Sequence, residues 1–205
     1  MNYKITLKPI LDFSISFLAI IVLSPIIVIA TILLALANNG KPFFIQKRPG
    51  KNERIFNIIK FKTMTDKKDS NGNLLPDSDR ITSIGKIIRK TSIDEIPQLF
   101  NVLKGDMSII GPRPLLPRYL PYYTNEERKR HHVKPGITGL AQVNGRNFID
   151  WEPRLKLDVK YVDTVSLKVD FNIFLKTIYK VLASEDVAVD ATKSQPYLDE
   201  LRRKE

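Results

Sequence analysis

One long uncharged segment constrains this chain more than any other feature. Residues 13–37 contain no charged side chain over 25 residues, which is long enough for an α-helix to cross the apolar core of a bilayer. A cleavable signal peptide is one alternative, because Ala35-Leu36-Ala37 resembles a cleavage site. The uncharged stretch is longer than the apolar region of such a peptide. The sequence therefore predicts a membrane helix over residues 1–38.

Flanking charge and a central proline bear on how this helix lies in the membrane. Lys4 and Lys8 precede it, and further basic residues follow it: Lys41, Lys47, Arg48, Lys51 and Arg54. Positive charge on both flanks favours both ends in the cytoplasm. Pro25 removes the hydrogen bond to the Ile21 carbonyl and kinks the helix, while the Ser24 hydroxyl can satisfy that carbonyl. A spanning helix also tolerates proline, but together the two features favour a re-entrant helix that enters and leaves the same leaflet.

The overall charge narrows the classes of partner. The chain has 33 Lys and Arg against 22 Asp and Glu, a formal net charge of +11. Such a balance suits nucleic acid, anionic lipid headgroups or phosphorylated substrates, and the charge alone does not choose among them. The chain has no cysteine, which excludes disulfides and zinc–thiolate sites.

An acidic pair, Asp94-Glu95, precedes an apolar helical stripe. The stripe ends before Gly105, where a helix C-cap belongs, and consists of Ile96, Leu99, Phe100 and Leu103. In one interpretation Ser92 caps the helix and Glu95 reaches back to it, but Pro97 then lies too far inside. In the other, Asp94 is the cap and Pro97 loses no intrahelical bond. Asp94 would then be ionised at the positive end of a helix dipole, as a candidate nucleophile beside a phosphate.

Several basic and polar residues are candidates for phosphate binding. Residues 59–64 alternate as a strand, with Lys60 and Lys62 on one face. Residues 84–90 predict a short basic helix that brings Arg89 close to the acidic pair.

Two loops add to these candidates. Prolines flank Arg113 on both sides, so a stiff loop presents its guanidinium for bidentate phosphate binding, although a surface turn is the alternative. The glycine-rich segment 134–147 can bring backbone N–H groups to a ligand, but it matches no standard phosphate-binding fingerprint. We expect its polar side chains to bind substrate: Gln142, Asn144 and Arg146.

The C-terminal part contains an amphipathic pattern. Lys176 and Lys180 lie opposite an apolar helical stripe formed by Phe171, Phe174, Leu175, Ile178 and Leu182. Core packing is the commoner meaning of such a stripe, and contact with a membrane interface is the second. Residues 184–205 are predicted to form a polar tail.

Taken together, these motifs resemble the monotopic phosphoglycosyl transferases, bacterial sugar transferases that begin glycoconjugate assembly on a membrane lipid. The resemblance covers about residues 5–183 and rests on Ser24-Pro25, Lys60-Phe61-Lys62-Thr63-Met64, Ser92-Ile93-Asp94-Glu95-Ile96-Pro97-Gln98-Leu99, Gly111-Pro112-Arg113-Pro114, Pro135-Gly136-Ile137-Thr138-Gly139 and Asn144-Gly145-Arg146-Asn147. Lys62 replaces the commoner arginine. The chain looks like the minimal single-domain form that serves N-linked protein glycosylation.

The resemblance implies an α+β, mainly helical fold. It places a re-entrant membrane helix at residues 1–38, a small cytoplasmic catalytic domain with short strands and interfacial amphipathic helices at 39–183, and the polar tail at 184–205. It also implies a location on the cytoplasmic face of the bacterial inner membrane, with downstream glycosyltransferases as partners.

The implied activity moves a sugar 1-phosphate from a UDP-sugar, expected to carry an N-acetylated amino sugar, to polyprenol phosphate (undecaprenyl phosphate). The reaction releases UMP and uses Mg2+. Asp94 is implied as nucleophile and metal ligand, through a covalent aspartyl phosphosugar, and Glu95 as its assistant. Lys60, Arg89 or Arg113 would neutralise the departing UMP.

Two non-catalytic readings compete with this one. A membrane-anchored nucleic-acid-binding protein would explain the charge and the anchor but leaves the acidic pair unexplained, and we expect no nucleic-acid partner. A purely structural lipid-binding module would show no Mg2+-dependent release of UMP.

Overall fold

A computed structural model describes residues 3–145, 149–183 and 196–203. The helices are η1 Tyr3–Leu7, α1 Lys8–Ala37, η2 Lys51–Glu53, α2 Asp77–Arg80, α3 Ser83–Lys90, η3 Ile93–Glu95, α4 Gln98–Leu103, η4 Pro117–Tyr122, α5 Asn125–Arg128, η5 Lys129–His132, α6 Leu140–Val143, α7 Trp151–Thr164, α8 Leu167–Leu182 and α9 Leu198–Arg202. The strands are β1 Phe43–Pro49, β2 Ile55–Phe61, β3 Ser108–Ile110 and β4 Gly136–Thr138. The mainly helical α+β class predicted from the sequence is confirmed.

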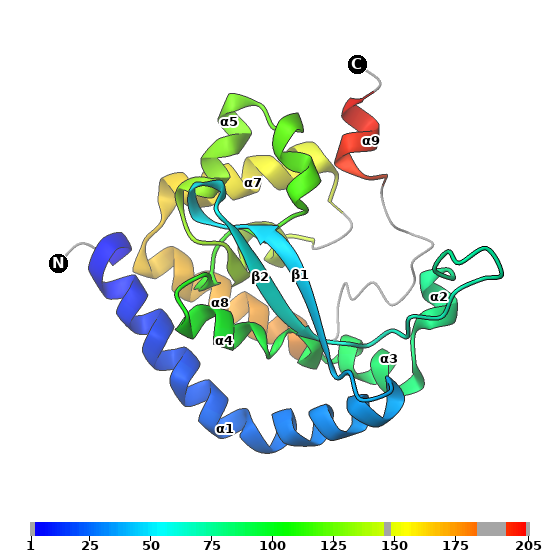
Figure 1. Ribbon diagram of the computed structural model, residues 1–205. Helices are drawn as coiled ribbons and strands as arrows, with labels where there is room; N and C mark the ends of the chain where they lie inside the picture. The colour runs from blue at the N-terminus through cyan, green and yellow to red at the C-terminus, as the bar shows by residue number, and fades with distance from the viewer. Residues whose placement is uncertain (1–2, 146–148, 184–195, 204–205) are drawn as a thin grey trace.

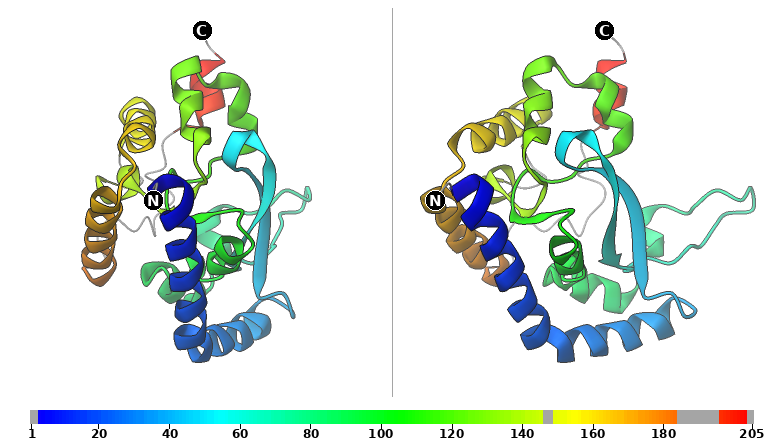
Figure 2. Two further views of the ribbon diagram at one scale, coloured as in Figure 1. Left: turned by 90° about the vertical axis from the view of Figure 1, so that its left-hand side faces the viewer. Right: turned by 60° about the vertical axis from the view of Figure 1, so that its left-hand side comes forward.

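Helix α1 is long, apolar and bent. The stretch Tyr3–Ala37 is long and apolar enough to cross a membrane, with a mean hydropathy of 3.0 over its most apolar part. Helix α1 bends near its middle (Figure 1) and contains Pro25, and Ser24 Oγ donates a hydrogen bond of 2.8 Å to the Ile21 carbonyl. The predicted kink and its satisfied carbonyl are therefore both present. In Figure 1 the sheets and the other helices lie on the concave side of the bend, and the right-hand view of Figure 2 shows α8 beside the first half of α1.

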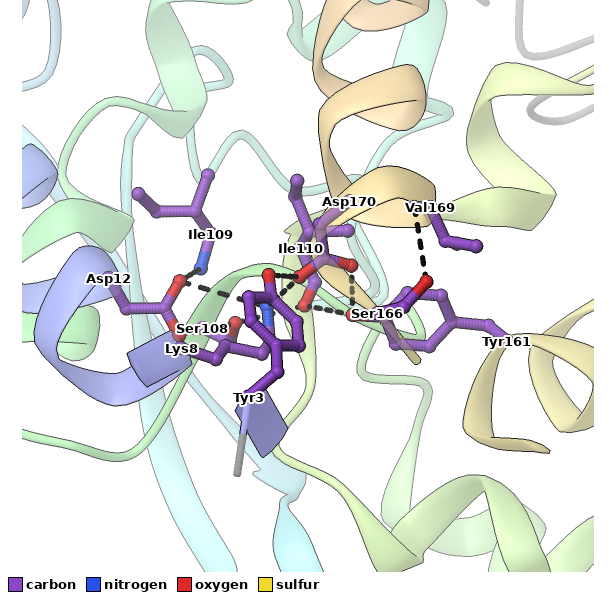
Figure 3. Close-up of polar contacts among 10 residues, drawn as sticks. All are labelled: Tyr3, Lys8, Asp12, Ser108, Ile109, Ile110, Tyr161, Ser166, Val169 and Asp170. Carbon is purple, nitrogen blue, oxygen red and sulfur yellow. Dashed lines mark hydrogen bonds and ion pairs between the residues drawn. The ribbon is translucent and has the colours of Figure 1, made fainter. Parts of the chain in front are cut away.

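Polar contacts tie the start of α1 to the interior (Figure 3). The Asp12 carboxylate accepts hydrogen bonds from Ser108 Oγ at 2.7 Å and from the Ile109 N–H at 3.1 Å, both on β3. Asp170 of α8 is the second acceptor of this network, and its carboxylate accepts from Tyr3 Oη at 2.6 Å, Lys8 Nζ at 2.7 Å and Tyr161 Oη at 2.8 Å. Buried carboxylates are stable only when paired in this way.

The second half of α1 packs through apolar contacts instead. Ala30 and Leu34 pack with Phe61 of β2 and Ile88 of α3, and Leu34 is completely buried. The opposite side of α1 is exposed and apolar, with Phe13, Phe17, Ile21, Val22, Ile29, Ile32 and Leu36. One side of α1 therefore packs against the protein core, and the other side is suited to an apolar environment outside the protein.

The two small sheets differ in topology. Strands β1 and β2 form an antiparallel hairpin, and β3 pairs with β4 in parallel. The predicted strand over 59–64 is only partly right, because β2 ends at Phe61 and the chain then leaves the hairpin. Met64 forms an isolated bridge with Ile81. The main core cluster gathers around β3, β4, α7 and α8, with Ile110, Val133, Val143, Tyr161, Val162 and Ile173.

Helix α8 shows its apolar stripe to the outside. The stripe residues Phe171, Phe174, Leu175, Ile178 and Leu182 are between 40% and 81% exposed. The core-packing interpretation of this stripe is therefore wrong. The buried residues of α8 are Asp170 and Ile173, so this helix packs inward through one carboxylate and one apolar side chain.

The segment predicted as a polar tail contains helix α9. Leu198 is 1% exposed and packs in a cluster with Leu115, Tyr119, Tyr123 and Leu155. Arg202 donates to both carboxylate oxygens of Glu127, at 2.6 and 2.7 Å. Helix α9 thus packs against the folded domain, and the mostly polar sequence around it did not reveal this contact.

Candidate active site

A cavity of about 580 Å³ opens beside the acidic pair. Its walls come from β2, α3, η3, α4, β4, α6, α7 and α8, together with the loop after β3. Residues far apart in the sequence therefore meet at one place.

The backbone around the acidic pair differs from both predicted caps. Helix α4 begins at Gln98 after Pro97, and neither Ser92 nor Asp94 caps it. Ser92 instead adopts a left-handed conformation with φ of 58°, which turns the chain sharply between α3 and η3. Such a conformation costs a non-glycine residue about 1 kcal/mol. The prediction that the dipole of α4 acts directly on Asp94 is therefore wrong. Gly105, with φ of 83°, follows the end of α4 as expected.

Glu95 binds the two nearest cations through one atom. Its Oε1 accepts from Lys60 Nζ at 2.6 Å and from the Arg113 guanidinium at 2.8 Å. Burial acts to raise the pKa of Glu95, but the charges and hydrogen bonds of Arg113 and Lys60 outweigh it and hold this pKa well below its usual range. Glu95 is therefore ionised throughout the physiological pH range.

Asp94 has the opposite environment. No hydrogen bond to its carboxylate occurs within the part of the chain that the structure describes. Burial, and then the neighbouring charge of Glu95, raise the pKa of Asp94 to about 6, while the nearby cations oppose this rise. At neutral pH Asp94 is thus mostly ionised and, among the described residues, accepts no hydrogen bond, which leaves both carboxylate oxygens available to a ligand.

The structure brings some predicted site residues together. The acidic pair and four predicted substrate-binding residues line the cavity: Lys60, Arg89, Arg113 and Gln142. Lys62 does not line it, because its ammonium group pairs with Asp66 after β2 has ended. Asn144 is exposed, and its side-chain amide donates to the Leu140 carbonyl of its own helix at 2.7 Å. Arg146 lies outside the described residues.

Sequence reasoning missed three charged residues of the cavity, Arg130, Arg154 and Asp158. Arg130 and Asp158 form an ion pair of 2.7 Å, with both side chains 2% exposed. One signal was available, because Asp158 falls on the apolar stripe of α7 next to Leu155 and Val159. A charged residue on a buried stripe needs a partner, and that need marks a site candidate.

The acidic pair also fits part of a Mg2+ site. The described residues contain no cluster of three or more acidic, His or Cys side chains that could hold a metal. Mg2+ is commonly bound by one or two carboxylates and completed by substrate phosphates. Asp94 offers such a carboxylate, whereas one oxygen of Glu95 is already engaged by two cations.

A bent apolar helix joined to an acidic site among cations fits the class of membrane-associated sugar-phosphate transferases predicted above. The model of the bacterial sugar transferase family matches residues 3–184, and the chain belongs to this family. The predicted phosphoglycosyl transferase class of enzyme is thereby confirmed, and nothing found supports a non-catalytic binding protein.

Relatives of known name are similar over most of this chain. The uncharacterized sugar transferase EpsL of Bacillus subtilis (strain 168) is 55% identical over 163 residues, which are 79% of this chain and 81% of EpsL. A UDP-N-acetylgalactosamine-undecaprenyl-phosphate N-acetylgalactosaminephosphotransferase of Aeromonas hydrophila is 40% identical over 84% of this chain and 43% of its own length. An undecaprenyl-phosphate glucose phosphotransferase of Komagataeibacter xylinus is 38% identical over 85% of this chain and 36% of its own length. The chain thus spans less than half of the last two.

Proposed function

We propose that this protein transfers a sugar 1-phosphate from a UDP-sugar to undecaprenyl phosphate and releases UMP. The observation that carries the proposal is the division of labour in the acidic pair. Glu95 holds Lys60 and Arg113, whereas the adjacent carboxylate of Asp94 faces the same cavity without a hydrogen-bond donor among the described residues. The names of the relatives from Aeromonas and Komagataeibacter support undecaprenyl phosphate as the acceptor.

The first displacement uses Asp94 as nucleophile. A carboxylate oxygen of Asp94 attacks the sugar-bearing phosphorus of the UDP-sugar. The bond from that phosphorus to the bridging oxygen breaks, and the bridging oxygen leaves with UMP. Asp94 then carries the sugar 1-phosphate as an acyl phosphate.

The second displacement returns the enzyme to its starting state. A phosphate oxygen of undecaprenyl phosphate attacks the same phosphorus, and the bond to Asp94 breaks. The product is a lipid-linked diphosphate sugar, and the carboxylate of Asp94 is regenerated. The two phosphorylated substrates therefore use one cavity in turn.

The cations stabilise charge during both steps. Lys60, Arg89 and Arg113 line the cavity beside Asp94, where fixed positive charge is most effective against charge that develops on phosphate oxygens. When bound, Mg2+ would be held by Asp94 together with substrate phosphates and would neutralise part of the diphosphate charge.

We propose further that α1 is re-entrant and holds the site at the cytoplasmic face of the membrane. Three observations support this: the bend of α1, which contains Pro25, the exposed apolar side of α1, and the position of most of the domain on the concave side of the bend in Figure 1. The exposed apolar stripe of α8 suits contact with the headgroup region.

The experiment is a reaction without lipid acceptor. Purified protein in detergent with Mg2+ and a saturating UDP-sugar should release at most one UMP per active site, and Asp94 should gain the mass of a sugar phosphate. Asp94→Asn should abolish both signals, because an amide of nearly the same shape is a poor nucleophile. Asp66→Asn is the matched control, since this carboxylate is exposed and lies outside the cavity, and it should leave both signals unchanged.

The same assay identifies the donor. Among UDP-N-acetylglucosamine, UDP-N-acetylgalactosamine, UDP-glucose and UDP-galactose, we expect an N-acetylated donor to give the fastest burst. If UMP appears only when lipid is present, and no adduct forms, the covalent mechanism is wrong and Asp94 is a base or a metal ligand.

A further inference from the structure

The main chain at Arg113 is fixed from three directions. Pro112 and Pro114 restrict the dihedral angles on both sides, because each proline fixes its own φ and limits the residue before it. The Gly136 N–H donates to the Pro112 carbonyl at 3.0 Å. The guanidinium of Arg130 donates to the Arg113 carbonyl at 2.7 Å. The last contact comes from a side chain, so it can be changed without altering the loop itself.

Arg130 is held as firmly as the carbonyl that it binds. Its Nε and one Nη donate to Asp158 Oδ2 at 3.1 and 2.7 Å, and the same Nη also donates to the Arg113 carbonyl. Arg130 is 3% exposed and Asp158 is 2% exposed. The Arg130 guanidinium also lies 5.6 Å from the centre of the Tyr123 ring. A buried charge held at this many points has very little freedom to move.

The chain of contacts continues into the reacting centre. From the fixed carbonyl, the side chain of Arg113 reaches Glu95 Oε1 at 2.8 Å, where Lys60 also binds. Asp158 on α7 therefore connects through Arg130 and Arg113 to the residue beside Asp94. The rate of a catalysed reaction falls steeply when an active-site group is displaced by as little as about 1 Å.

We propose that Arg130, oriented by Asp158, is a positioning residue that sets where the Arg113 guanidinium lies in the cavity. The inference rests on the proposed function, because it concerns the charge that Arg113 stabilises during the displacement at phosphorus. Arg130 is paired with Asp158 and donates to the Arg113 carbonyl, so we place its effect on the reaction at that carbonyl.

The test replaces Arg130 with lysine. Lysine keeps the positive charge, but its single ammonium group cannot reproduce the planar fork that binds a carboxylate and a carbonyl together. At saturating UDP-sugar, Arg130→Lys should lower the rate of the UMP burst by about 10- to 100-fold. The half-saturating concentration of UDP-sugar should change by less than about twofold, because Lys60 and Arg89 still attract the substrate.

A double-mutant cycle separates positioning from general damage. If Arg130 acts through Arg113, Arg130→Lys should cause almost no further loss in a protein that already has Arg113→Ala. Arg128→Lys is the matched control, because Arg128 also donates to a carboxylate and a main-chain carbonyl, those of Glu53 and Leu120, but does not line the cavity. It should leave the burst unchanged.

Folding is measured by thermal unfolding of each variant in the same detergent. If Arg130→Lys does not fold, Asp158→Asn takes its place in the same cycle, with a smaller expected loss that again disappears in the Arg113→Ala background. An unchanged burst in folded variants, or an equal loss with and without Arg113, would overturn the proposal. The wild-type burst, measured in parallel, shows separately whether the proposed function holds.

Discussion

A single carboxylate oxygen, Oε1 of Glu95, accepts hydrogen bonds from both Lys60 and Arg113. The adjacent Asp94 accepts no hydrogen bond within the described structure. Two adjacent acids are thereby pushed toward different ionisation behaviour, with the pKa of Glu95 lowered and that of Asp94 raised to about 6. Separation of this kind assigns distinct roles to two otherwise similar groups. Glu95 pairs with Lys60 and Arg113, and in the proposed mechanism Asp94 is the residue that reacts.

The raised pKa of Asp94 predicts how the reaction depends on pH. In the proposed mechanism the attacking form is the Asp94 carboxylate, so kcat/KM for UMP release should fall as pH decreases through about 6. Glu95→Gln removes the neighbouring negative charge and should move this midpoint to lower pH. Initial rates between pH 5 and 8 measure both effects. A midpoint that stays in place in Glu95→Gln would contradict the assigned coupling.

The same pKa predicts a change in stability. Folding raises the pKa of Asp94 from 3.8 to about 6. The free energy of unfolding therefore decreases as pH increases between these two values, because the folded state disfavours the ionised carboxylate. Asp94→Asn avoids this loss and should raise the free energy of unfolding by about 1–3 kcal/mol above pH 6, with no difference below about pH 4. Urea unfolding at pH 4, 6 and 8 tests it.

Glu95→Gln provides the opposite control for stability. Because folding lowers the pKa of Glu95, the amide should destabilise the protein at neutral pH, and the difference should shrink as pH falls. Two variants at neighbouring positions are therefore expected to shift stability in opposite directions. Shifts of the same sign would show that the two environments are assigned wrongly.

At the scale of single elements, local chemistry was predictable and burial was not. The kink at Pro25 and the Ser24 hydrogen bond follow from a proline and a hydroxyl within one helical turn, so the sequence contained all the partners. For the apolar stripe of α8 the sequence left two interpretations open, because residues such as Phe171 look the same whether they face a core or a membrane interface. The start of α4 was misplaced because Ser92 adopts a conformation that serine rarely takes.

The proposed re-entrant form of α1 gives a prediction at the scale of one element. Single cysteines at Asn2 and Lys41 should both react with a membrane-impermeant reagent only from the cytoplasmic side, because both ends of a re-entrant helix emerge there. Pro25→Leu restores the missing hydrogen bond and should shift part of the population to the spanning form. Labelling of position 2 from outside in the native sequence would establish a span.

At the scale of the whole molecule, the site depends on contacts that no local pattern contains. Lys60, Glu95 and Arg113 come from three segments, and their meeting at one oxygen follows from how β2, η3 and the loop after β3 are packed. The list of cations was therefore predictable in part, but their arrangement was not. The pair Arg130 and Asp158 was missed for the same reason, because its two members are 28 positions apart.

The way α1 is built into the domain limits what can replace it. Asp12 satisfies the Ile109 N–H and Ser108 of β3, and Leu34 fills a core cluster beside β2 and α3. A foreign transmembrane segment grafted in its place would leave donors unpaired at one end and a void at the other. The anchor is therefore not a module that can be exchanged among membrane proteins. Over evolutionary time, changes in it and in the catalytic domain must be matched to each other.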